Sequence, residues 1–573
     1  MRTRPIRRRA VPEALAFGET LHPVLRRVYA ARGVASTDDL DLGLDRLLPV
    51  GTLDGVETAA ELLATHVGRG SRILVVGDFD ADGATASAVV VRALRRLGHA
   101  EVGFLVPDRF RFGYGLTPEI VALAHERRPA LLVTVDNGVS SVAGVKAARA
   151  LGMDVLVTDH HLPGMELPDA TAMVNPNLAG CAFGSRALAG CGVAFYVMAA
   201  LARRLGAPAS TIVDLLDLVA LGTVADVVPL DRNNRILVAQ GLRRIRAGRC
   251  VPGIAALAEV AGRRLAALGA TDLGFVLGPR LNAAGRLDDM SIGIECLLTD
   301  DPARARELAE QLDRLNAERR VIEGRMQEDA LEIVRRMKFD APGAKLPGGL
   351  CLYDESWHPG VVGLVAARVK EHVHRPVIAF APADGGFVRG SARSVAGVHV
   401  RDVIEAVATR EPGLVEKFGG HAMAAGLTVA DAKLPRFAEA FADEVARRAD
   451  PSALQGILVT DGALAAPELC LETAESLRGA GPWGQAFPEP TFDNEFAVVE
   501  VRTLKDQHLK LWVRPDLQAP PVEAIAFGWV AKPGHVPPRP QTKVQLVYRL
   551  DVNEYPGLRR PQLLVDYVEP RPG

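Results

Sequence analysis

The stretch Ile73-Leu-Val-Val-Gly-Asp78-Phe-Asp80-Ala-Asp82-Gly83 runs from a short apolar segment straight into three aspartates at alternate positions. An uncharged apolar run of this length is typical of a buried strand. The pattern recurs twice, because Leu131–Val135 precedes Asp136 and Val155–Val157 precedes Thr158-Asp159-His160-His161. An acidic segment therefore follows each of three predicted strands.

Predicted strands and helices alternate between about residues 55 and 235. The strand candidates are Ile73–Val76, Val102–Val106, Leu131–Val135, Val155–Val157 and Ala172–Val174. The helix candidates between them are Ala84–Leu97, Pro118–His125 and Val142–Leu151. Such alternation predicts an α/β fold with a parallel sheet and helices on both faces. The carboxyl ends of parallel strands open into one crevice, so the acidic segments should converge there.

This convergence predicts a metal centre. A fourth segment, Gly222-Thr-Val-Ala-Asp226, adds a further carboxylate. A single aspartate after a strand is most often a helix cap or a turn residue, but caps require neither an Asp-x-Asp-x-Asp run nor a His pair. Closely packed carboxylates repel one another unless cations lie between them, so we expect two divalent ions. Carboxylate and imidazole ligands together favour Mn²⁺ and also allow Mg²⁺.

Two adjacent metal ions suit the hydrolysis of a phosphate ester or anhydride, because they can bridge a phosphate and generate hydroxide. The sequence has no Gly-x-Ser-x-Gly nucleophile motif and no Gly-x-x-x-x-Gly-Lys-Ser/Thr phosphate loop. The natural reaction class is therefore metal-dependent phosphoester hydrolysis.

Composition limits the other possibilities. The chain has 573 residues, 48% of them hydrophobic, which predicts three or four domains with a large core. The net charge of −2 excludes a globally basic nucleic-acid binder, although a basic path on one face stays possible. Six cysteines without a Cys-x-x-Cys pair indicate neither a zinc knuckle nor a disulfide framework. The basic N-terminus lacks the apolar stretch of a secretory signal, and no apolar run reaches membrane length, so we expect a cytoplasmic protein.

Five parts are predicted along the chain. Residues 1–54 form a short, helical lead-in that could be frayed, and residues 55–300 form the catalytic domain with its helical extension. Residues 301–340 carry apolar positions at helical spacing and predict one long connecting helix, with two shorter helices as the alternative. Residues 341–450, which begin with a Pro/Gly-rich linker over 341–349, form a second mixed domain. Residues 451–573 show alternating strand patterns between turns and predict a small β-barrel.

The ordered set of motifs resembles the DHH phosphoesterase superfamily. Within it, the chain is similar over nearly its whole length to the RecJ family of single-strand-specific DNA exonucleases. Besides the acidic segments, the similarity rests on the segments 221–230, 277–287, 357–363, 390–394, 418–426 and 481–490. It implies a DHH catalytic domain, a DHHA1 domain and an OB-fold domain. The implied activity is 5′-to-3′ digestion of single-stranded DNA to mononucleotides, in DNA repair and recombination.

The resemblance assigns roles to the acidic segments. Asp78 and Asp80 should hold one ion, Asp82, His160 and Asp226 the other, and Asp136 should bridge the two. His161 is expected to contact the scissile phosphate, with an orienting role beside His160 or Asp159 as the alternative. Asp159 is expected to orient His160. The implied catalytic set is Asp136, Asp159 and His161.

Substrate-binding residues are implied in the same way. In the loop Pro107-Asp-Arg109-Phe-Arg-Phe-Gly-Tyr114, the arginine offers a fork for phosphate and the tyrosine a face for base stacking. A phosphate or terminal-nucleotide pocket is expected from Arg280, Asn282, Arg286, Ser391, Arg393 and His421. In the barrel, the candidates for single-strand binding are Trp483, His508, Lys510 and Trp512. For Trp512 a place in the barrel core is an equal alternative.

Two rival functions stay open from the residues alone. One is a DHH phosphodiesterase that acts on short oligonucleotides or cyclic dinucleotides, although such proteins usually lack the barrel and the long helix. The other is a non-catalytic DNA-binding scaffold, which would be expected to lose acidic ligands. The resemblance further implies a helicase and a single-strand-binding protein as partners, and we expect a monomer.

Overall fold

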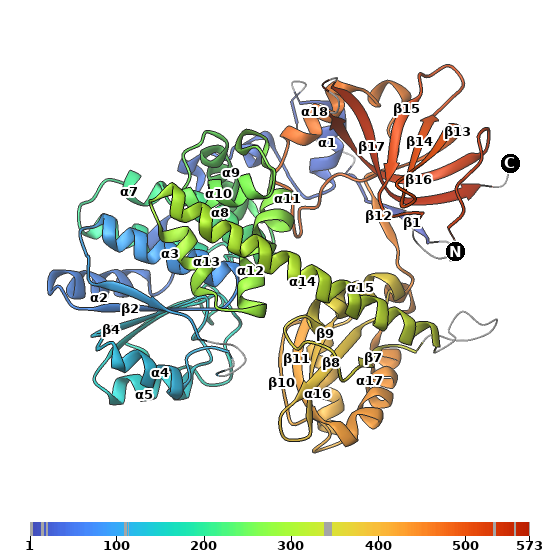
Figure 1. Ribbon diagram of the computed structural model, residues 1–573. Helices are drawn as coiled ribbons and strands as arrows, with labels where there is room; N and C mark the ends of the chain where they lie inside the picture. The colour runs from blue at the N-terminus through green and yellow to red at the C-terminus, as the bar shows by residue number, and fades with distance from the viewer. Residues whose placement is uncertain are drawn as a thin grey trace.

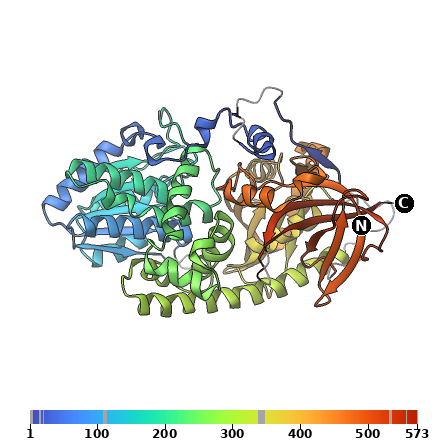
Figure 2. The same ribbon diagram turned by 90° about the horizontal axis from the view of Figure 1, so that it is seen from above.

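The computed structural model describes residues 4–12, 17–18, 21–107, 112, 114–336, 347–530, 535–554, 557 and 559–571. The long helix α14 (Pro302–Arg336) connects an α/β body to a second, smaller body, and a β-barrel lies beyond them (Figure 1). Seen from above, α14 runs along one side of the molecule (Figure 2).

The first body is built on a five-stranded sheet in which every neighbouring pair is parallel. In spatial order its strands are β3 (Val102–Leu105), β2 (Ile73–Gly77), β4 (Leu131–Val135), β5 (Asp154–Thr158) and β6 (Ala172–Val174). The predicted parallel α/β fold is confirmed.

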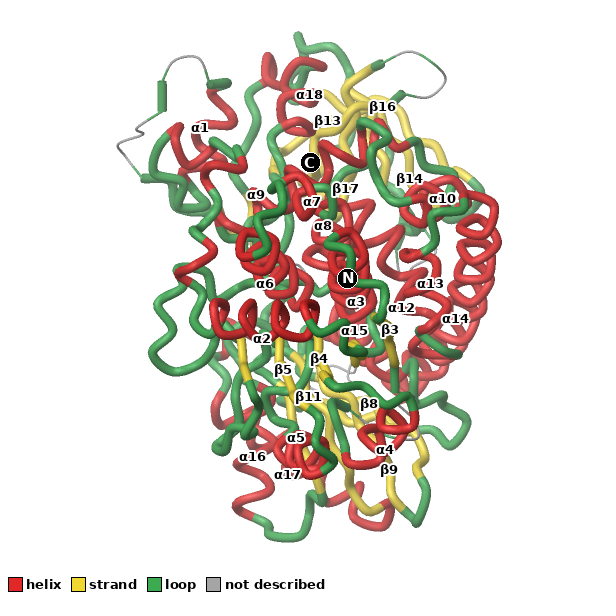
Figure 3. The backbone as a smooth tube through the Cα atoms, turned by 90° about the vertical axis from the view of Figure 1, so that its left-hand side faces the viewer, coloured by secondary structure: helices red, strands yellow, loops and turns green. Residues whose placement is uncertain are grey.

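Helices cover both faces of this sheet (Figures 1 and 3). On one side lie α2 (Val56–Gly68) and α3 (Ala81–Arg96), and on the other α4 (Pro118–Glu126) and α5 (Val142–Ala150). Strand β2 alternates between these two layers: Ile73 and Val75 join the large core, while Leu74 and Val76 join the core beneath α4 and α5. Two-sided burial explains why the strand is continuously apolar.

The strand order creates a switch point between β2 and β4. The chain leaves β2 toward β3 on one side and then crosses to β4 on the other side. Connections that diverge in this way leave a crevice beyond the carboxyl ends of the two central strands. The acidic segments after β2 and β4 both begin at this crevice.

A helical layer follows the sheet. Its helices are α6 (Gly190–Arg204), α7 (Ser210–Val213), α8 (Leu216–Ala225), α9 (Arg232–Arg246), α10 (Pro252–Val260), α11 (Ala270–Asp272), α12 (Gly278–Leu287) and α13 (Ser291–Leu298). The next helix, α14, is continuous over its 35 residues, so the alternative of two shorter helices is wrong.

The second body has a mixed sheet. Its strand order is β10 (Lys417–Gly420), β11 (Ala424–Ala430), β9 (Phe387–Arg393), β8 (Val377–Ala383) and β7 (Leu350–Tyr353). Only β7 and β8 pair in parallel. Its helices are α15 (Val362–Val373), α16 (Val400–Arg410) and α17 (Leu434–Arg448). Of the linker predicted over 341–349, residues 341–346 lie outside the described residues.

The C-terminal strands close into a barrel. Its strands, in the order β13 (Phe492–Leu504), β14 (His508–Arg514), β15 (Val522–Ala526), β17 (Arg560–Arg571) and β16 (Lys543–Asn553), form a ring. Strands β15 and β17 are parallel and the remaining pairs are antiparallel. A closed five-stranded barrel of this kind has the architecture of an OB-fold, as predicted.

The N-terminal segment differs from the helical lead-in that we predicted. Strand β1 (Ile6–Arg8) pairs in parallel with β12 (Leu458–Thr460), and only then does helix α1 (Pro23–Ala30) begin. Helix α1 contacts α18 (Leu471–Gly479), which precedes the barrel. The first residues thus pack against the chain beyond residue 450, a pairing that local sequence patterns cannot reveal.

A buried ion pair holds this junction together. The guanidinium of Arg32 donates two hydrogen bonds to the carboxylate of Asp461, at 2.8 and 2.9 Å, and both side chains are 1% exposed. Arg9 Nη1 lies 3.4 Å from the same carboxylate.

None of the described helices combines the length and the apolar character that a membrane crossing requires.

We expect Asp461→Ala to lower the stability of the junction by about 3–5 kcal/mol, because the substitution leaves Arg32 buried without its counter-charge. Thermal unfolding monitored by calorimetry checks this expectation. The matched control is Glu101→Ala, which removes an exposed partner of Arg72 at 3.3 Å and should cost less than about 1 kcal/mol. Equal effects of the two substitutions would contradict the structural role of the buried pair.

Candidate metal centre

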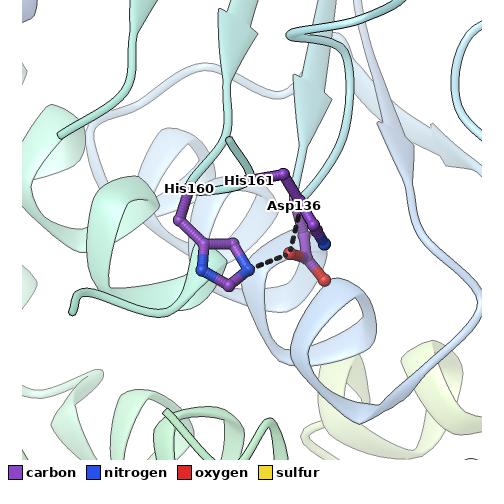
Figure 4. Close-up of side chains that lie close together, drawn as sticks. All are labelled: Asp136, His160 and His161. Atoms are coloured by element: carbon purple, nitrogen blue, oxygen red, sulfur yellow. Dashed lines mark ion pairs between the residues drawn. The ribbon is translucent and has the colours of Figure 1, made fainter. Parts of the chain in front are cut away.

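The acidic segments converge at the switch point of the sheet. Three groups of side chains each bring their potential ligand atoms within 4.8 Å of one another. The groups are Asp78 with Asp80 and Asp136, Asp82 with His160 and Asp226, and Asp136 with His160 and His161. Asp136 belongs to two of the groups, as a residue that bridges two ions would. His160 Nε2 lies 3.0 Å from Asp136 Oδ1 (Figure 4). The same nitrogen lies 3.6 Å from Asp226 Oδ2.

Asp80 is both a helix cap and a member of the cluster. Its Oδ1 accepts hydrogen bonds from the backbone N–H groups of Asp82 and Gly83, at 2.9 and 3.0 Å, and so caps α3. The cap fixes the carboxylate at the start of the helix. The common structural role of an aspartate after a strand is therefore present here together with the metal-binding geometry.

Asp82 is anchored from the opposite direction. Its Oδ2 and Oδ1 accept hydrogen bonds from the N–H groups of Gly190 and Cys191 at the start of α6, at 2.6 and 2.9 Å. A Cβ at Gly190 would lie 2.6 Å from the Cβ of Asp136, so a side chain there would displace the bridging carboxylate. A Cβ at Gly222 would lie 2.9 Å from Asp82 Oδ1. We did not predict a role for these glycines. The only signal for them in the sequence is a small residue at a helical position.

Asp136 has a left-handed backbone, with φ of 59°, which is uncommon for a residue other than glycine. The neighbouring Asn137 stabilises this turn, because its Nδ2 donates to the carbonyls of Val135 and Val76, at 2.9 and 3.1 Å. The amide thereby joins the ends of β4 and β2, the two strands whose loops carry the ligands. We predicted no role for Asn137 from the sequence.

Burial makes this concentration of carboxylates unfavourable without cations. Burial and the neighbouring Asp226 raise the pKa of Asp82 to about 7, and burial and the neighbouring Asp80 raise the pKa of Asp226 to about 7. The pKa of Asp136 is raised well above its ordinary value by burial and then by Asp82. Burial lowers the pKa of His160, which favours the neutral imidazole that binds metals.

The donor atoms of the cluster fit a metal ion. Asp136 Oδ1, His160 Nε2 and Asp226 Oδ2 are buried and form no hydrogen bond with the described residues. Buried polar atoms rarely stay without a hydrogen-bond partner. Carboxylate oxygens combined with one imidazole nitrogen suit Mn²⁺ and also admit Mg²⁺.

Asp159 orients a different imidazole from the one we predicted. Its Oδ1 accepts from the backbone N–H groups of His160 and His161, at 2.7 and 3.0 Å, and lies 2.8 Å from His161 Nδ1. The ring that Asp159 fixes is therefore that of His161. Burial opposes a charged His161, but the hydrogen bond with Asp159 and the nearby carboxylates outweigh this effect and raise the pKa of His161 to about 9.

The aromatic residues around His161 place it at the open side of the centre. The hydroxyl of Tyr114, a residue that is 48% exposed, lies 3.1 Å from His161 Nδ1. The ring of His421, from the second body, stacks on His161 with 5.9 Å between the ring centroids. His161 thus lies between the metal cluster and the second body. Arg109, predicted to bind phosphate in the same loop as Tyr114, lies outside the described residues.

The predicted terminal-nucleotide residues separate into two groups. On the second body, Arg393 Nη1 donates to Ser391 Oγ at 3.0 Å, on the same sheet as the loop of His421. On α12 the three predicted residues contact protein groups: Asn282 accepts from Ala81 N at 2.8 Å, Arg286 donates to Gly360 O at 3.0 Å, and Arg280 contacts Asp313 at 2.8 Å. Because Asp313 lies on α14, the guanidinium of Arg280 joins α12 to α14. The same guanidinium also donates to Val276 O at 2.6 Å.

The barrel candidates also differ in position. Trp483 packs against Tyr29 and Phe487, with ring centroids 5.8 and 5.2 Å away, so it belongs to the contact with α1. Trp512 alternates with the buried Leu511 and Val513 and lies on the outer face of β14, which makes its assignment to the barrel core wrong. Arg502 and Lys510 lie over the Trp512 ring at 4.9 and 5.0 Å. His508 Nδ1 accepts from Gly528 N at 2.9 Å.

Comparison with known families and structures gives one consistent result. The chain matches the DHH family, N-terminal domain over residues 72–223, the DHHA1 domain over 347–447 and the RecJ OB domain over 460–567. It is 52% identical over 579 residues to the single-stranded-DNA-specific exonuclease RecJ of Dickeya dadantii, covering 99% of both chains. It is 51% identical to the Escherichia coli (strain K12) protein of the same name, again covering 99% of both chains.

Two solved structures have the same architecture. The crystal structure of Thermus thermophilus RecJ in complex with Mn²⁺ aligns with a TM-score of 0.82 and 32% identity, over 99% of this chain and 80% of that chain. The Mg²⁺ complex from the same organism aligns with a TM-score of 0.77 and 30% identity, over 99% of this chain and 79% of that chain.

We expect Mn²⁺ to raise the thermal unfolding midpoint of metal-free protein, since an ion that binds only the folded state stabilises it by about 2.7 kcal/mol at 100 times its dissociation constant. Asp136→Ala should abolish most of this shift. Asp169→Ala is the matched control, because that side chain is 95% exposed in the same domain. A full Mn²⁺ shift in Asp136→Ala would exclude a shared ligand.

Proposed function

This chain belongs to the RecJ family of single-stranded-DNA-specific exonucleases, and from that premise we propose that it hydrolyses single-stranded DNA from the 5′ end and releases mononucleotides. The observation that carries the proposal is the convergence of three groups of potential ligands that are linked through Asp136 and His160, with His421 stacked on His161 beside them. The chain is a hydrolytic exonuclease that depends on divalent metal. We propose three further points, namely the 5′ polarity, the mononucleotide product and the presence of two ions.

We assign Asp78, Asp80 and Asp136 to one ion, and Asp82, Asp136, His160 and Asp226 to the other. When bound, two such ions polarise the phosphate and supply a hydroxide nucleophile at neutral pH. The protein holds these ligands in place by the Asp80 cap and by the N–H groups of α6 that bind Asp82. His161, oriented by Asp159, is placed to contact a phosphate oxygen.

The proposed 5′ polarity rests on the second body. Ser391, Arg393 and His421 offer a hydroxyl, a guanidinium and an imidazole at the same end of one sheet, and His421 stacks on His161 of the metal centre. An Arg guanidinium and small-residue loops suit a terminal phosphate. A 5′-phosphate bound there would lie close to the metal centre, and cleavage would remove the terminal nucleotide. Arg280, Asn282 and Arg286 support this pocket from α12.

The proposed path of the strand continues over the barrel. Arg502, Lys510 and Trp512 form a patch that places two cations against one aromatic ring on the outer face of β13 and β14, where Arg502 also pairs with Glu500 at 2.6 Å and Lys510 with Glu523 at 2.9 Å. OB-folds bind single strands on this part of the barrel by combining positive charge with base stacking. Removing the chain beyond residue 450 would also remove the partners of β1 and α1, so single substitutions test this patch more cleanly.

The rival functions have less support. A scaffold would not need the complete ligand set, and a dinucleotide phosphodiesterase would not need the barrel, whereas this chain has both. We propose that it acts in DNA repair and recombination as a cytoplasmic monomer, together with a helicase and a single-strand-binding protein. The DNA substrate supports the cytoplasmic location, and a substrate that must be unwound and kept single-stranded supports these partners.

We expect strands blocked by phosphorothioate linkages at the 5′ end to resist digestion and strands blocked at the 3′ end to be degraded. Arg393→Ala should remove the preference for a 5′-phosphate, because it deletes the guanidinium of the pocket. Gel analysis of end-labelled strands measures both effects. Arg389→Ala is the matched control, since it removes an exposed arginine from the same strand, further from His421. Resistance of the 3′-blocked strand alone would reverse the assigned polarity.

Trp512→Ala should weaken the binding of long single strands by about 1–3 kcal/mol, the contribution of one base–aromatic stack. Fluorescence anisotropy over a salt series measures the affinity, and cleavage of very short oligonucleotides should stay unchanged. Leu517→Ala is the control, because it shortens a side chain that is 84% exposed on the loop after β14. If Trp512→Ala binds long strands as tightly as the control, the patch has another purpose, such as docking a protein.

A further inference from the structure

We propose that Asn175 and Asn177 position both histidines of the metal centre. Both asparagines lie just after β6, the last strand of the catalytic sheet. The inference rests on the proposed function, because it assigns residues that hold His160 as a ligand and His161 as a phosphate contact. Neither asparagine touches the metal cluster through a ligand atom, so both are positioning residues.

Each asparagine donates to the backbone carbonyl of one histidine. Asn175 Nδ2 donates to His161 O at 2.9 Å, and Asn177 Nδ2 donates to His160 O at 2.6 Å. Asn175 is fully buried and Asn177 is half-buried. Since both carbonyls belong to adjacent residues, the two amides together fix the orientation of consecutive peptide planes.

Asp159 holds the N–H groups of the same two histidines. Its Oδ1 accepts from His160 N and His161 N, and its Oδ2 accepts from Val139 N at 2.9 Å. The His-His turn is therefore clamped through its N–H groups by β5 and through its carbonyls by the segment after β6. Such a clamp is needed because the turn itself lies outside the sheet ladder.

Fixed peptide planes matter because the two imidazoles have different tasks. The ring centroids are only 4.5 Å apart, yet His160 Nε2 points toward Asp136 and Asp226 while His161 points toward Asp159, Tyr114 and His421. A rotation of either peptide would redirect both rings. Groups that orient metal ligands in this way typically change metal affinity about 10–100-fold when they are substituted.

A purely structural role for the Asn-Pro-Asn turn can be separated from positioning. Asn175 Oδ1 accepts from Asn177 N at 2.7 Å, which stabilises the turn itself. Asn175→Asp keeps this acceptor and loses the donor to His161 O. Asn494→Asp is the matched control: Asn494 Nδ2 donates to Leu464 O at 2.9 Å and its Oδ1 accepts from Leu464 N at 3.0 Å, near the barrel.

The experiment compares Mn²⁺ binding to metal-free wild-type, Asn175→Asp and Asn494→Asp proteins by calorimetry, together with kcat and KM on single-stranded DNA. We expect Asn175→Asp to weaken Mn²⁺ binding about 10–100-fold and to lower kcat with KM unchanged. Asn494→Asp should match wild type in all three quantities. Asn177→Ala, which adds no charge and changes a half-buried residue, should shift Mn²⁺ affinity in the same direction as Asn175→Asp.

Three results would overturn the inference. If both asparagine variants fold and bind Mn²⁺ as wild type does, the clamp does not position the ligands, although the proposed nuclease function stands. A Mn²⁺ affinity that falls equally in Asn494→Asp would show a general loss of stability instead of positioning. Failure of the wild-type protein to bind Mn²⁺ would remove the metal centre itself, and with it both the proposed function and this inference.

Discussion

The mutual repulsion of buried carboxylates is the constraint on which the rest of this structure depends. Asp82, Asp136 and Asp226 lie close together with raised pKa values, which they would not have in water. Divalent cations remove this penalty, and folding must supply the rigid frame that keeps the carboxylates together until the ions bind. The frame is the switch point of a parallel sheet, where strands buried on both faces cannot shift register without exposing apolar side chains.

Backbone groups provide most of the local precision. The α6 N–H groups hold Asp82, the Asp80 cap fixes the start of α3, and Asn137 joins the ends of β2 and β4. Close approach of these backbones explains the glycine at 190 beside Asp136. Asp82 and the turn at Asp136 are thus held by groups outside the proposed ligand set, and such positioning groups matter to a metal centre as the ligands do.

Helix α14 brings the second body to this centre. Arg280 joins it to α12 through Asp313, and the buried Arg319 joins Glu323, which also accepts from Arg368 of α15. In the pairs that connect α14 to other helices, one partner is partly exposed, Asp313 at 40% and Arg368 at 53%. They help to fix the angle between the two bodies because each hydrogen bond has a direction. His421 stacks on His161, which brings the predicted terminal-phosphate residues next to the metal centre.

The sequence by itself determined the parallel sheet, the long helix, the barrel and the residues that could bind metal. Apolar periodicity and acidic residues directly after strands are local signals, and they do not depend on the rest of the fold. Only the tertiary structure decided that Asp159 fixes His161, that Arg280 pairs with α14, that β1 pairs with β12 and that Asn175 and Asn177 hold the His-His turn. These contacts join segments whose local patterns are compatible with many partners, so the partner is selected by how the elements pack.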